Sequence, residues 1–130
     1  MIKGSCCCGA IQIELAAPPS MLGKCHCTRC RKLGVGDLVF VKKADLTLLQ
    51  GREAITVFEP TEAYTYRRCF CKICGTGLGE ILSDDESFPI SAHVLDDEIT
   101  LPVKFHEFTS EKPEWSAIGD DAPQFTHHPG

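Results

Sequence analysis

The sequence predicts a mainly β fold made of short antiparallel strands. Apolar and β-branched residues occur in short runs, several of which alternate with polar residues at the period of two that a strand requires. Gly, Pro and Asp residues separate these runs at roughly the 8–12-residue spacing of all-β domains. No long amphipathic helical pattern is present, and only residues 114–118 are expected to form a single helical turn.

The expected strands follow one another closely along the chain. Residues 10–15 alternate between apolar and polar, and Pro18-Pro19 ends this strand. The β-branched run 55–58 stops at Pro60, and residues 63–68 alternate into a group of cysteines. The other runs expected to form strands are 38–41, 46–49, 78–82, 88–94 and 103–108. With 130 residues and no linker-like segment, the chain fits one domain, residues 1–130.

Composition excludes several classes of protein. The chain is 43% hydrophobic and 24% charged, which is typical of a soluble globular domain. No run of 18 apolar residues is present, so a transmembrane span is excluded, and the first residues lack the apolar region of a signal peptide. Clustered thiols in such a chain indicate a reducing compartment, and we predict a cytoplasmic protein without a membrane partner.

Nine cysteines lie in three tight groups, at 6–8, 25–30 and 69–74. A disulfide framework is disfavoured, because nine is an odd number and cysteines two apart on an extended chain are poor partners. Thiolates at two- and three-residue steps can instead converge on one tetrahedral metal ion, for which zinc is the simplest candidate. The groups therefore predict metal centres.

One predicted centre joins the first and third groups. Cys6 and Cys8 share a face if their segment is extended, and Cys71 and Cys74 lie across a tight turn followed by Gly75. Four thiolates with no open position are the arrangement of a structural zinc. Because this metal would join distant parts of the chain, its binding is expected to contribute directly to folding.

The second predicted centre uses the middle group. Its three cysteines lie within six residues: Cys25, Cys27 and Cys30. Three protein ligands with one exchangeable position are the catalytic arrangement, and a thiolate-rich zinc site suits a thiol substrate. The alternative is that Cys69 closes this site as a fourth ligand, since it shares strand parity with Cys71.

The remaining candidates near the cysteines have structural interpretations. His26 lies between two same-facing cysteines and is expected to point away from them. Cys7 and Cys69, which neither centre requires, are expected to be buried small side chains.

Basic residues crowd the middle cysteine group, although the net charge of the chain is −5. Arg29, Arg31 and Lys32 are the candidate substrate-binding residues, because arginine pairs well with carboxylates. A local basic zone in an acidic protein favours a small anionic ligand and makes nucleic acid an unlikely partner. No motif indicates an oligomeric state.

Three cysteine motifs occur in order along the chain: Gly4-Ser5-Cys6-x-Cys8-Gly9, Cys25-His26-Cys27-x-x-Cys30-Arg31-Lys32 and Phe70-Cys71-x-x-Cys74-Gly75-Thr76. Leu95-Asp96-Asp97 follows, and then Trp115 and Asp120. This combination resembles the glutathione-dependent formaldehyde-activating enzyme family, which is also similar to centromere protein V. The resemblance covers essentially the whole domain.

The resemblance implies a β-tent zinc-binding fold with two zinc ions per chain. It places a structural zinc on Cys6, Cys8, Cys71 and Cys74, and an active-site zinc on Cys25, Cys27 and Cys30. The implied activity is that of a carbon–sulfur lyase. Such an enzyme joins glutathione and formaldehyde as S-hydroxymethylglutathione, or splits that adduct, so its partners are a small-molecule thiol and an aldehyde.

Two alternatives stand beside this hypothesis. One is a non-catalytic two-zinc module that binds protein or nucleic acid, since two closed zinc sites and a basic zone require no chemistry. The other is the same lyase chemistry on a thiol other than glutathione, which the motifs do not distinguish from the first.

Overall fold

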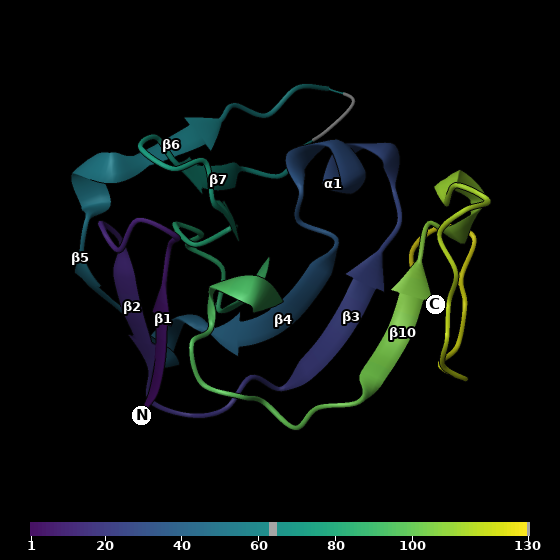
Figure 1. The fold of residues 1–130 in the computed structure, drawn as a ribbon, viewed down its shortest axis with the longest axis horizontal. Coiled ribbons are helices and arrows are strands. Elements are labelled where there is room, and N and C mark those ends of the chain that lie inside the picture. The colour runs from purple at the N-terminus through teal and green to yellow at the C-terminus, as the bar shows by residue number, and fades with distance from the viewer. Residues whose placement is uncertain (63–64, 130) are drawn as a thin grey trace.

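The strands form two sheets in the computed structural model, which describes residues 1–62 and 65–129 (Figure 1). The smaller sheet has the order β1-β2-β5, and the larger has the order β10-β3-β4-β9-β8-β7-β6. The strands are β1 (Ile2–Ser5), β2 (Gln12–Leu15), β3 (Met21–Cys25), β4 (Asp37–Lys42), β5 (Leu46–Gln50), β6 (Ile55–Phe58), β7 (Arg68–Cys71), β8 (Gly77–Gly79), β9 (Ser87–Ser91) and β10 (Val103–Glu107). The prediction of a mainly β fold is confirmed.

The helical segments are all short. The helix α1 (Thr28–Leu33) has 6 residues, and the remaining helical turns are η1 (Lys43–Asp45), η2 (Arg52–Ala54), η3 (Ala92–Val94) and η4 (Thr109–Glu111). In the described part of the chain, no helix has the length and apolar character needed to span a membrane. The expected helical turn at 114–118 is wrong: the Ser116 N–H closes a simple turn onto the Pro113 carbonyl at 3.1 Å.

Sequence patterns missed α1 and two strands. The helix was signalled by Gly34, which caps it in the left-handed conformation (φ 73°), and by basic residues in its last turn. The strands β1 and β3 have no clean alternation, and each is a strand because it pairs with a neighbour, Ile2 with Leu15 and Leu22 with Val39.

Several expected strands have different bounds. The strand expected at 63–68 is wrong, because the strand β7 begins only at Arg68. Ala63 and Tyr64 lie outside the described residues. The strand expected at 78–82 is cut short at Gly79, which has φ 75°. The one expected at 88–94 ends at Ser91, where the turn η3 begins.

The prediction of antiparallel pairing fails for one pair, because β10 runs parallel to β3. The chain between β9 and β10 crosses the molecule and reaches the free edge of β3 in the same direction as that strand (Figure 1). Parallel strands end together, so Glu107 lies opposite Cys25. The pairing therefore brings the end of β10 and the residues after it to the middle cysteine group.

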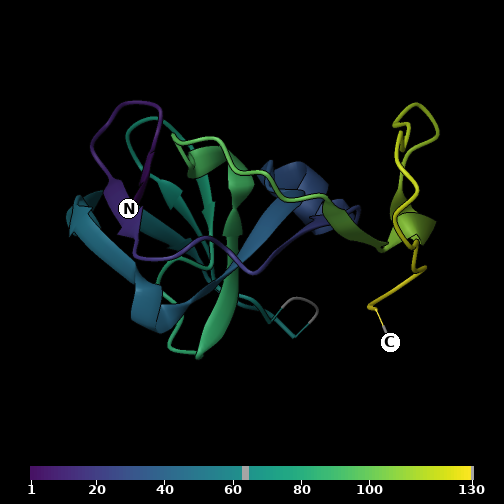
Figure 2. The ribbon, with the colours of Figure 1, turned by 90° about the horizontal axis from the view of Figure 1, so that it is seen from below.

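The two sheets share one apolar core. It contains Ile11, Ile13, Leu15, Val39, Val41, Leu78, Phe88, Ile90 and Val94. A second, smaller cluster contains Cys25, Cys27, Cys30, Val35 and Leu38. The chain after β10 stands apart from the two-sheet body when the molecule is seen from below (Figure 2).

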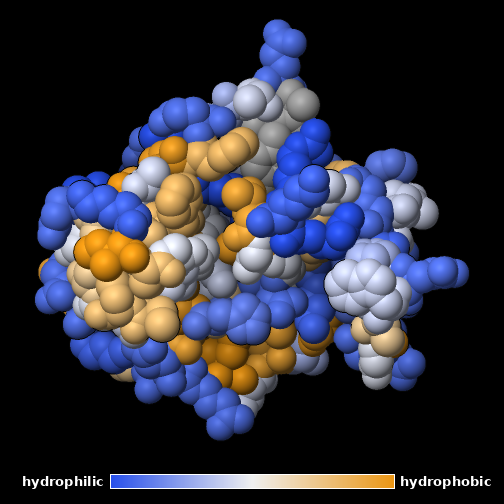
Figure 3. Space-filling view, turned by 45° about the horizontal axis from the view of Figure 1, so that its top comes forward, coloured by the Kyte–Doolittle hydropathy of each residue, from blue (hydrophilic) through white to orange (hydrophobic). Residues whose placement is uncertain are grey.

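Large apolar side chains at the surface are dispersed. They are Met1, Leu49, Phe58, Tyr66, Ile73 and Trp115. On the face seen in Figure 3, the apolar groups are interrupted by hydrophilic residues. That face therefore presents no single broad apolar patch of the kind that marks a large protein interface.

Candidate metal centres and active site

The first and third cysteine groups converge on one point. The Sγ atoms of Cys6, Cys8, Cys71 and Cys74 all lie within 4.8 Å of one another. Cys8 Sγ lies 3.6 Å from that of Cys6 and 3.8 Å from that of Cys71. Zinc–sulfur bonds of about 2.3 Å in a tetrahedron hold the sulfurs about 3.8 Å apart. The four thiols therefore fit a zinc ion.

A turn, rather than the extended segment expected from the sequence, brings Cys6 and Cys8 together. The strand β1 ends at Ser5, and the Gly9 N–H then donates to the Cys6 carbonyl at 3.0 Å. Cys7 occupies the tip of this turn and is exposed, so its expected burial is wrong. Its backbone N–H donates to the Thr76 hydroxyl at 3.0 Å, which ties the turn to the other half of the centre.

The turn after β7 supplies the other two thiols. The Gly75 N–H donates to the Cys71 carbonyl at 2.8 Å, and Gly75 has φ 79°, so the glycine expected at this position is required by the backbone. The Thr76 hydroxyl lies 3.1 Å from Cys74 Sγ. This hydrogen bond, followed by that of the Thr76 backbone N–H, lowers the pKa of Cys74 to about 5. The thiolate that a metal requires is thus favoured.

Leu95-Asp96-Asp97 holds the strand that leads into this centre. The Ser5 hydroxyl donates to the Asp96 carboxylate at 2.9 Å, and the Lys3 backbone N–H donates to Asp97 Oδ2 at 2.7 Å. Gly4 and Leu95 form an isolated bridge. The motif therefore positions β1, and with it Cys6, against the segment after η3.

The middle group forms a second centre at the junction of β3 and α1. Cys25 ends β3, Cys27 is the N-cap of α1 and Cys30 lies in its first turn. Cys27 Sγ accepts the Cys30 N–H at 3.3 Å. The three Sγ atoms lie within 4.8 Å of one another and all three residues are buried. Their donor set and spacing also fit a zinc ion.

Hydrogen bonds within this cluster favour one thiolate. The Cys25 thiol, and then the Cys30 thiol, lower the pKa of Cys27, while burial opposes them. A thiolate is therefore accessible in the cluster before a metal binds.

Within the described residues, the second cluster holds three ligand atoms and Cys69 is not one of them. Cys69 is buried in the main core, where its thiol contacts the Arg67 carbonyl at 3.8 Å. Cys69 and Cys71 share one face of β7, so Arg68 points to the other face. Cys69 is buried, as expected for a small core side chain.

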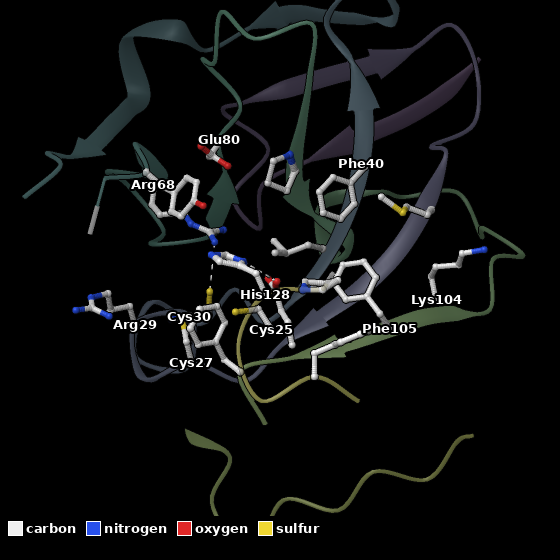
Figure 4. Close-up of a pocket in the computed structure, with 18 of the residues that line it drawn as sticks. Cys25, Cys27, Arg29, Cys30, Phe40, Arg68, Glu80, Lys104, Phe105 and His128 are labelled. Carbon is white, nitrogen blue, oxygen red and sulfur yellow. Dashed lines mark hydrogen bonds and ion pairs between the residues drawn. The ribbon is translucent and has the colours of Figure 1, made fainter. Parts of the chain in front are cut away.

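Arg68 is the residue of β7 that meets the second cluster. It is only 6% exposed, and its Nη2 donates to Cys30 Sγ at 3.3 Å (Figure 4). A cation at this distance favours thiolates over thiols. The sequence analysis did not single out Arg68. Strand alternation was a usable signal, because it places Arg68 on the face opposite to Cys69 and Cys71.

His26 points to β10, and the cluster of ligand atoms does not include it. Its Nε2 lies 2.8 Å from Nδ1 of His106, and Nε2 of His106 lies 3.0 Å from an Asp120 carboxylate oxygen. His106 is 1% exposed. This network orients the segment between two cluster cysteines, in the way that outer hydrogen bonds position metal ligands. The sequence did not predict this network, because His26 and His106 are 80 residues apart along the chain.

A cavity of about 960 Å³ opens onto the second cluster (Figure 4). Charged side chains of both signs line it: Arg29, Arg68 and Lys104, with Glu62, Glu80 and Glu107. Apolar side chains make up most of the rest: Met21, Leu38, Phe40, Pro89, Phe105, Phe108, Pro123, Phe125 and Pro129. The three cysteines thus lie in a pocket large enough for a small-molecule ligand.

The basic residues predicted to bind substrate are divided between two pockets. Arg29 is exposed and lines the cysteine pocket. Arg31 and Lys32 line a separate cavity of about 500 Å³, beside Trp115, which is 83% exposed. Arg31 and Lys32 lie in the last turn of α1, where a positive charge interacts favourably with the negative end of the helix dipole. The two cavities share Cys25.

Glu80 is a half-buried carboxyl in the cysteine pocket. Burial raises its pKa, and the nearby charge of Arg68 opposes that rise. A carboxyl group in this state is a candidate for proton transfer.

We expect Glu80→Gln to raise the melting temperature by a few degrees at about pH 8, and to raise it less at about pH 5. Because the folded pKa lies above the unfolded value, the carboxylate lowers stability once pH rises through the folded pKa. Below the unfolded pKa both states are protonated, and this contribution is absent. Melting temperatures of both proteins at several pH values, followed by circular dichroism, measure the effect.

The matched control is Glu62→Gln, because Glu62 lines the same pocket but is exposed. We expect it to change the melting temperature equally at both pH values. A Glu80→Gln effect that is independent of pH would contradict a carboxyl group destabilised by burial.

Fold and site together define a small mainly β protein with two cysteine clusters that could each hold a metal ion, one of them open to a pocket. The sequence profile described as glutathione-dependent formaldehyde-activating enzyme matches residues 1–111. The chain belongs to this family, which is generally enzymatic, with carbon–sulfur lyase activity.

A solved structure supports the fold. The crystal structure of a Rhodobacter sphaeroides protein is similar to this chain, with a TM-score of 0.60 and 27% sequence identity, covering 75% of this chain and 90% of the other. No curated protein matches the chain in sequence.

Proposed function

We propose that this protein is a carbon–sulfur lyase that forms or cleaves S-hydroxymethylglutathione, with Cys25, Cys27 and Cys30 holding an active-site zinc. The observation that carries the proposal is a cluster of three buried thiols that opens into a pocket beside a buried arginine. We propose a structural role for the zinc on Cys6, Cys8, Cys71 and Cys74. Family membership supports both assignments.

The reaction forms one carbon–sulfur bond and moves one proton. In synthesis the thiol sulfur adds to the aldehyde carbon, and the thiol proton ends on the former carbonyl oxygen. Cleavage reverses both changes. When bound, zinc supplies a Lewis acid that favours a thiolate and polarises an aldehyde.

Arg68 and Glu80 are the protein groups suited to the charge and proton changes. The guanidinium of the buried Arg68, held at Cys30, stabilises negative charge on the reacting sulfur or oxygen. Glu80, whose pKa is raised by burial, is suited to pass a proton to the adduct oxygen in synthesis and to accept it again in cleavage.

Arg29 and Lys104 are suited to bind substrate carboxylates. They lie toward opposite ends of the cysteine pocket, and Arg29 extends away from the sulfurs (Figure 4). Arg31 and Lys32 remain candidates for contacts through the neighbouring cavity, which borders Cys25. Holding both reactants in one pocket lowers the entropic part of the barrier.

Exchange spectroscopy by NMR on mixtures of glutathione and formaldehyde tests the proposal. We expect zinc-loaded protein to accelerate exchange between free glutathione and its adduct, relative to buffer containing the same amount of zinc. Absence of acceleration would reject this substrate pair. The same experiment with cysteine or other small thiols separates glutathione from another thiol substrate.

Arg68→Gln provides a residue-specific test. We expect a loss of acceleration on the order of 10²-fold, as for removal of other groups that stabilise developing charge. Arg52→Gln is the matched control, because Arg52 is exposed on η2 and does not line the pocket. Equal rates in the two variants would contradict the assigned role of Arg68.

The contacts of basic side chains weaken the alternative of a nucleic-acid-binding module. Lys24 lies 3.6 Å from Asp37, Lys43 lies 3.0 Å from Asp84, and Lys3 is also paired, with Glu14. Such pairs reduce the positive potential available to phosphates. Filter binding at low salt tests this alternative, which predicts tight, salt-sensitive retention of nucleic acid.

A further inference from the structure

We propose that the cysteine pocket takes a thiol–aldehyde adduct bearing an apolar group of about phenyl size, and that residues 123–129 form one wall of its subsite. The inference rests on the proposed function, since the apolar group belongs to the substrate of the same three-cysteine centre. We call this the apolar subsite; its aromatic residues are Phe40, Phe105, Phe108 and Phe125.

Several aromatic side chains line the pocket that contains the sulfurs. Phe40 and Phe105 have ring centroids 6.2 Å apart at an interplanar angle of 49°, and both lie to one side of the cysteines in Figure 4. All four aromatic residues of the subsite are half-buried. Their exposed ring surface is therefore available to an apolar group, whose transfer from water would drive binding.

Gly23 on β3 makes room for one of these rings. A Cβ atom at this position would lie 2.4 Å from the ring of Phe105. The ring therefore packs directly onto the backbone of β3, next to the strand end that carries Cys25. Because this contact fixes the ring, the part of the subsite formed by Phe105 is preformed.

Charge and size also favour an apolar substituent. Apart from the cysteines and His128, three basic and three acidic side chains line the pocket, so these six do not favour a ligand of one charge. Its volume of about 960 Å³ lies near the upper end of the range of roughly 300–1,000 Å³ for ligand pockets. An adduct of glutathione and formaldehyde would pair with the charged side chains, but it has no apolar group to contact the aromatic wall.

The chain after β10 is fastened along this pocket. The His106 N–H donates to the Pro123 carbonyl at 2.9 Å, and the Phe125 N–H donates to the His106 carbonyl at 2.8 Å. The Phe108 N–H donates to the His127 carbonyl at 3.0 Å. In Figure 1 this yellow segment lies beside β10. These backbone bonds hold Phe125 in place without involving its side chain.

Two further contacts hold the end of the segment. Nδ1 of His128 lies 3.1 Å from a Glu107 carboxylate oxygen. The rings of Phe108 and His128 contact each other edge to face, with their centroids 4.8 Å apart.

The family profile ends at residue 111, so residues 123–129 lie outside the matched region. The match to the family profile therefore does not extend to the wall that they form.

Calorimetric titration of the zinc-loaded full chain tests the inference. The two probes are S-methylglutathione and S-benzylglutathione; the second differs from a benzaldehyde–glutathione adduct by one hydroxyl group. We expect S-benzylglutathione to bind about tenfold more tightly or better, as for burial of one aromatic ring. Equal affinities would overturn the inference.

Phe125→Ala should reduce the preference for the benzyl probe over S-methylglutathione severalfold. The matched control is Phe58→Ala, because Phe58 is 43% exposed on β6 and does not line the pocket. Phe40→Leu is a second variant that tests the part of the subsite formed by β4 with little change in side-chain volume. A preference that persists in both subsite variants would overturn the assignment of these walls.

Exchange measurements identify which reactant carries the apolar group. Faster exchange with glutathione and benzaldehyde than with glutathione and formaldehyde places it on the aldehyde; faster exchange with benzyl mercaptan and formaldehyde places it on the thiol. Acceleration with glutathione and formaldehyde, but no preference for the benzyl probe, would overturn this inference and leave the proposed function intact. A benzyl preference without exchange of any pair would support the subsite and overturn the proposed function.

Discussion

The Cys71→Ser variant is expected to be unfolded or strongly destabilised, with loss of one zinc. Cys71 is fully buried, and its thiol lies in the cluster that joins the Cys6–Gly9 turn to β7, 63 residues further along the chain. Structural zinc contributes on the order of 10 kcal/mol in small modules, which is comparable to the total stability of about 5–15 kcal/mol of a typical domain. Thermal melts and metal content of variant and wild type measure the effect.

Cys7→Ser is the matched control for this prediction. It makes the same chemical change in the neighbouring turn, but Cys7 is exposed and lies outside the cluster. We expect it to retain the wild-type melting temperature and both zinc ions. Coincident melts for Cys71→Ser and wild type, with two zinc ions bound, would show that the division into structural and active-site centres is wrong.

The Cys27→Ser variant is expected to lose lyase activity and one zinc, and to remain folded. The three cysteines of this centre come from one short segment, so their metal closes a small loop and constrains little of the chain. Serine is also a good N-cap, and its hydroxyl can replace the Cys27 sulfur as acceptor of the Cys30 N–H. Circular dichroism, metal content and the exchange assay separate these effects.

Cys69→Ala tests whether this centre is open. The Cys69 thiol lies against the Arg67 carbonyl in the main core, so removing it should cost only packing. We expect full metal content and full activity. Loss of the second zinc would instead make Cys69 a ligand and the centre a closed structural site, and it would overturn the proposed enzyme activity.

Which cysteines group together could be predicted from the sequence, although the turn that joins Cys6 and Cys8 was expected to be an extended segment. Spacings of two and three residues place Cys25, Cys27 and Cys30 close together in any compact backbone, and the turn at Cys71–Gly75 follows from its glycine. The mainly β character followed from the short runs and the turn residues between them, because both signals are local. The four-cysteine cluster was also predicted, since four thiolates are the usual closed zinc set.

Contacts between distant segments depended on the tertiary structure. Alternation predicts that Arg68 and Cys69 point to opposite faces of a strand, but only the sheet order decides that Arg68 faces Cys30. The parallel pairing of β3 with β10 was not predictable from strand propensity, because propensity carries no information about partner or direction. That pairing alone brings His106 to His26, and the aromatic residues around β10 to the cysteine pocket. Residue spacing thus predicted which cysteines could share a metal, whereas strand pairing across the molecule decided which charged and aromatic side chains surround it.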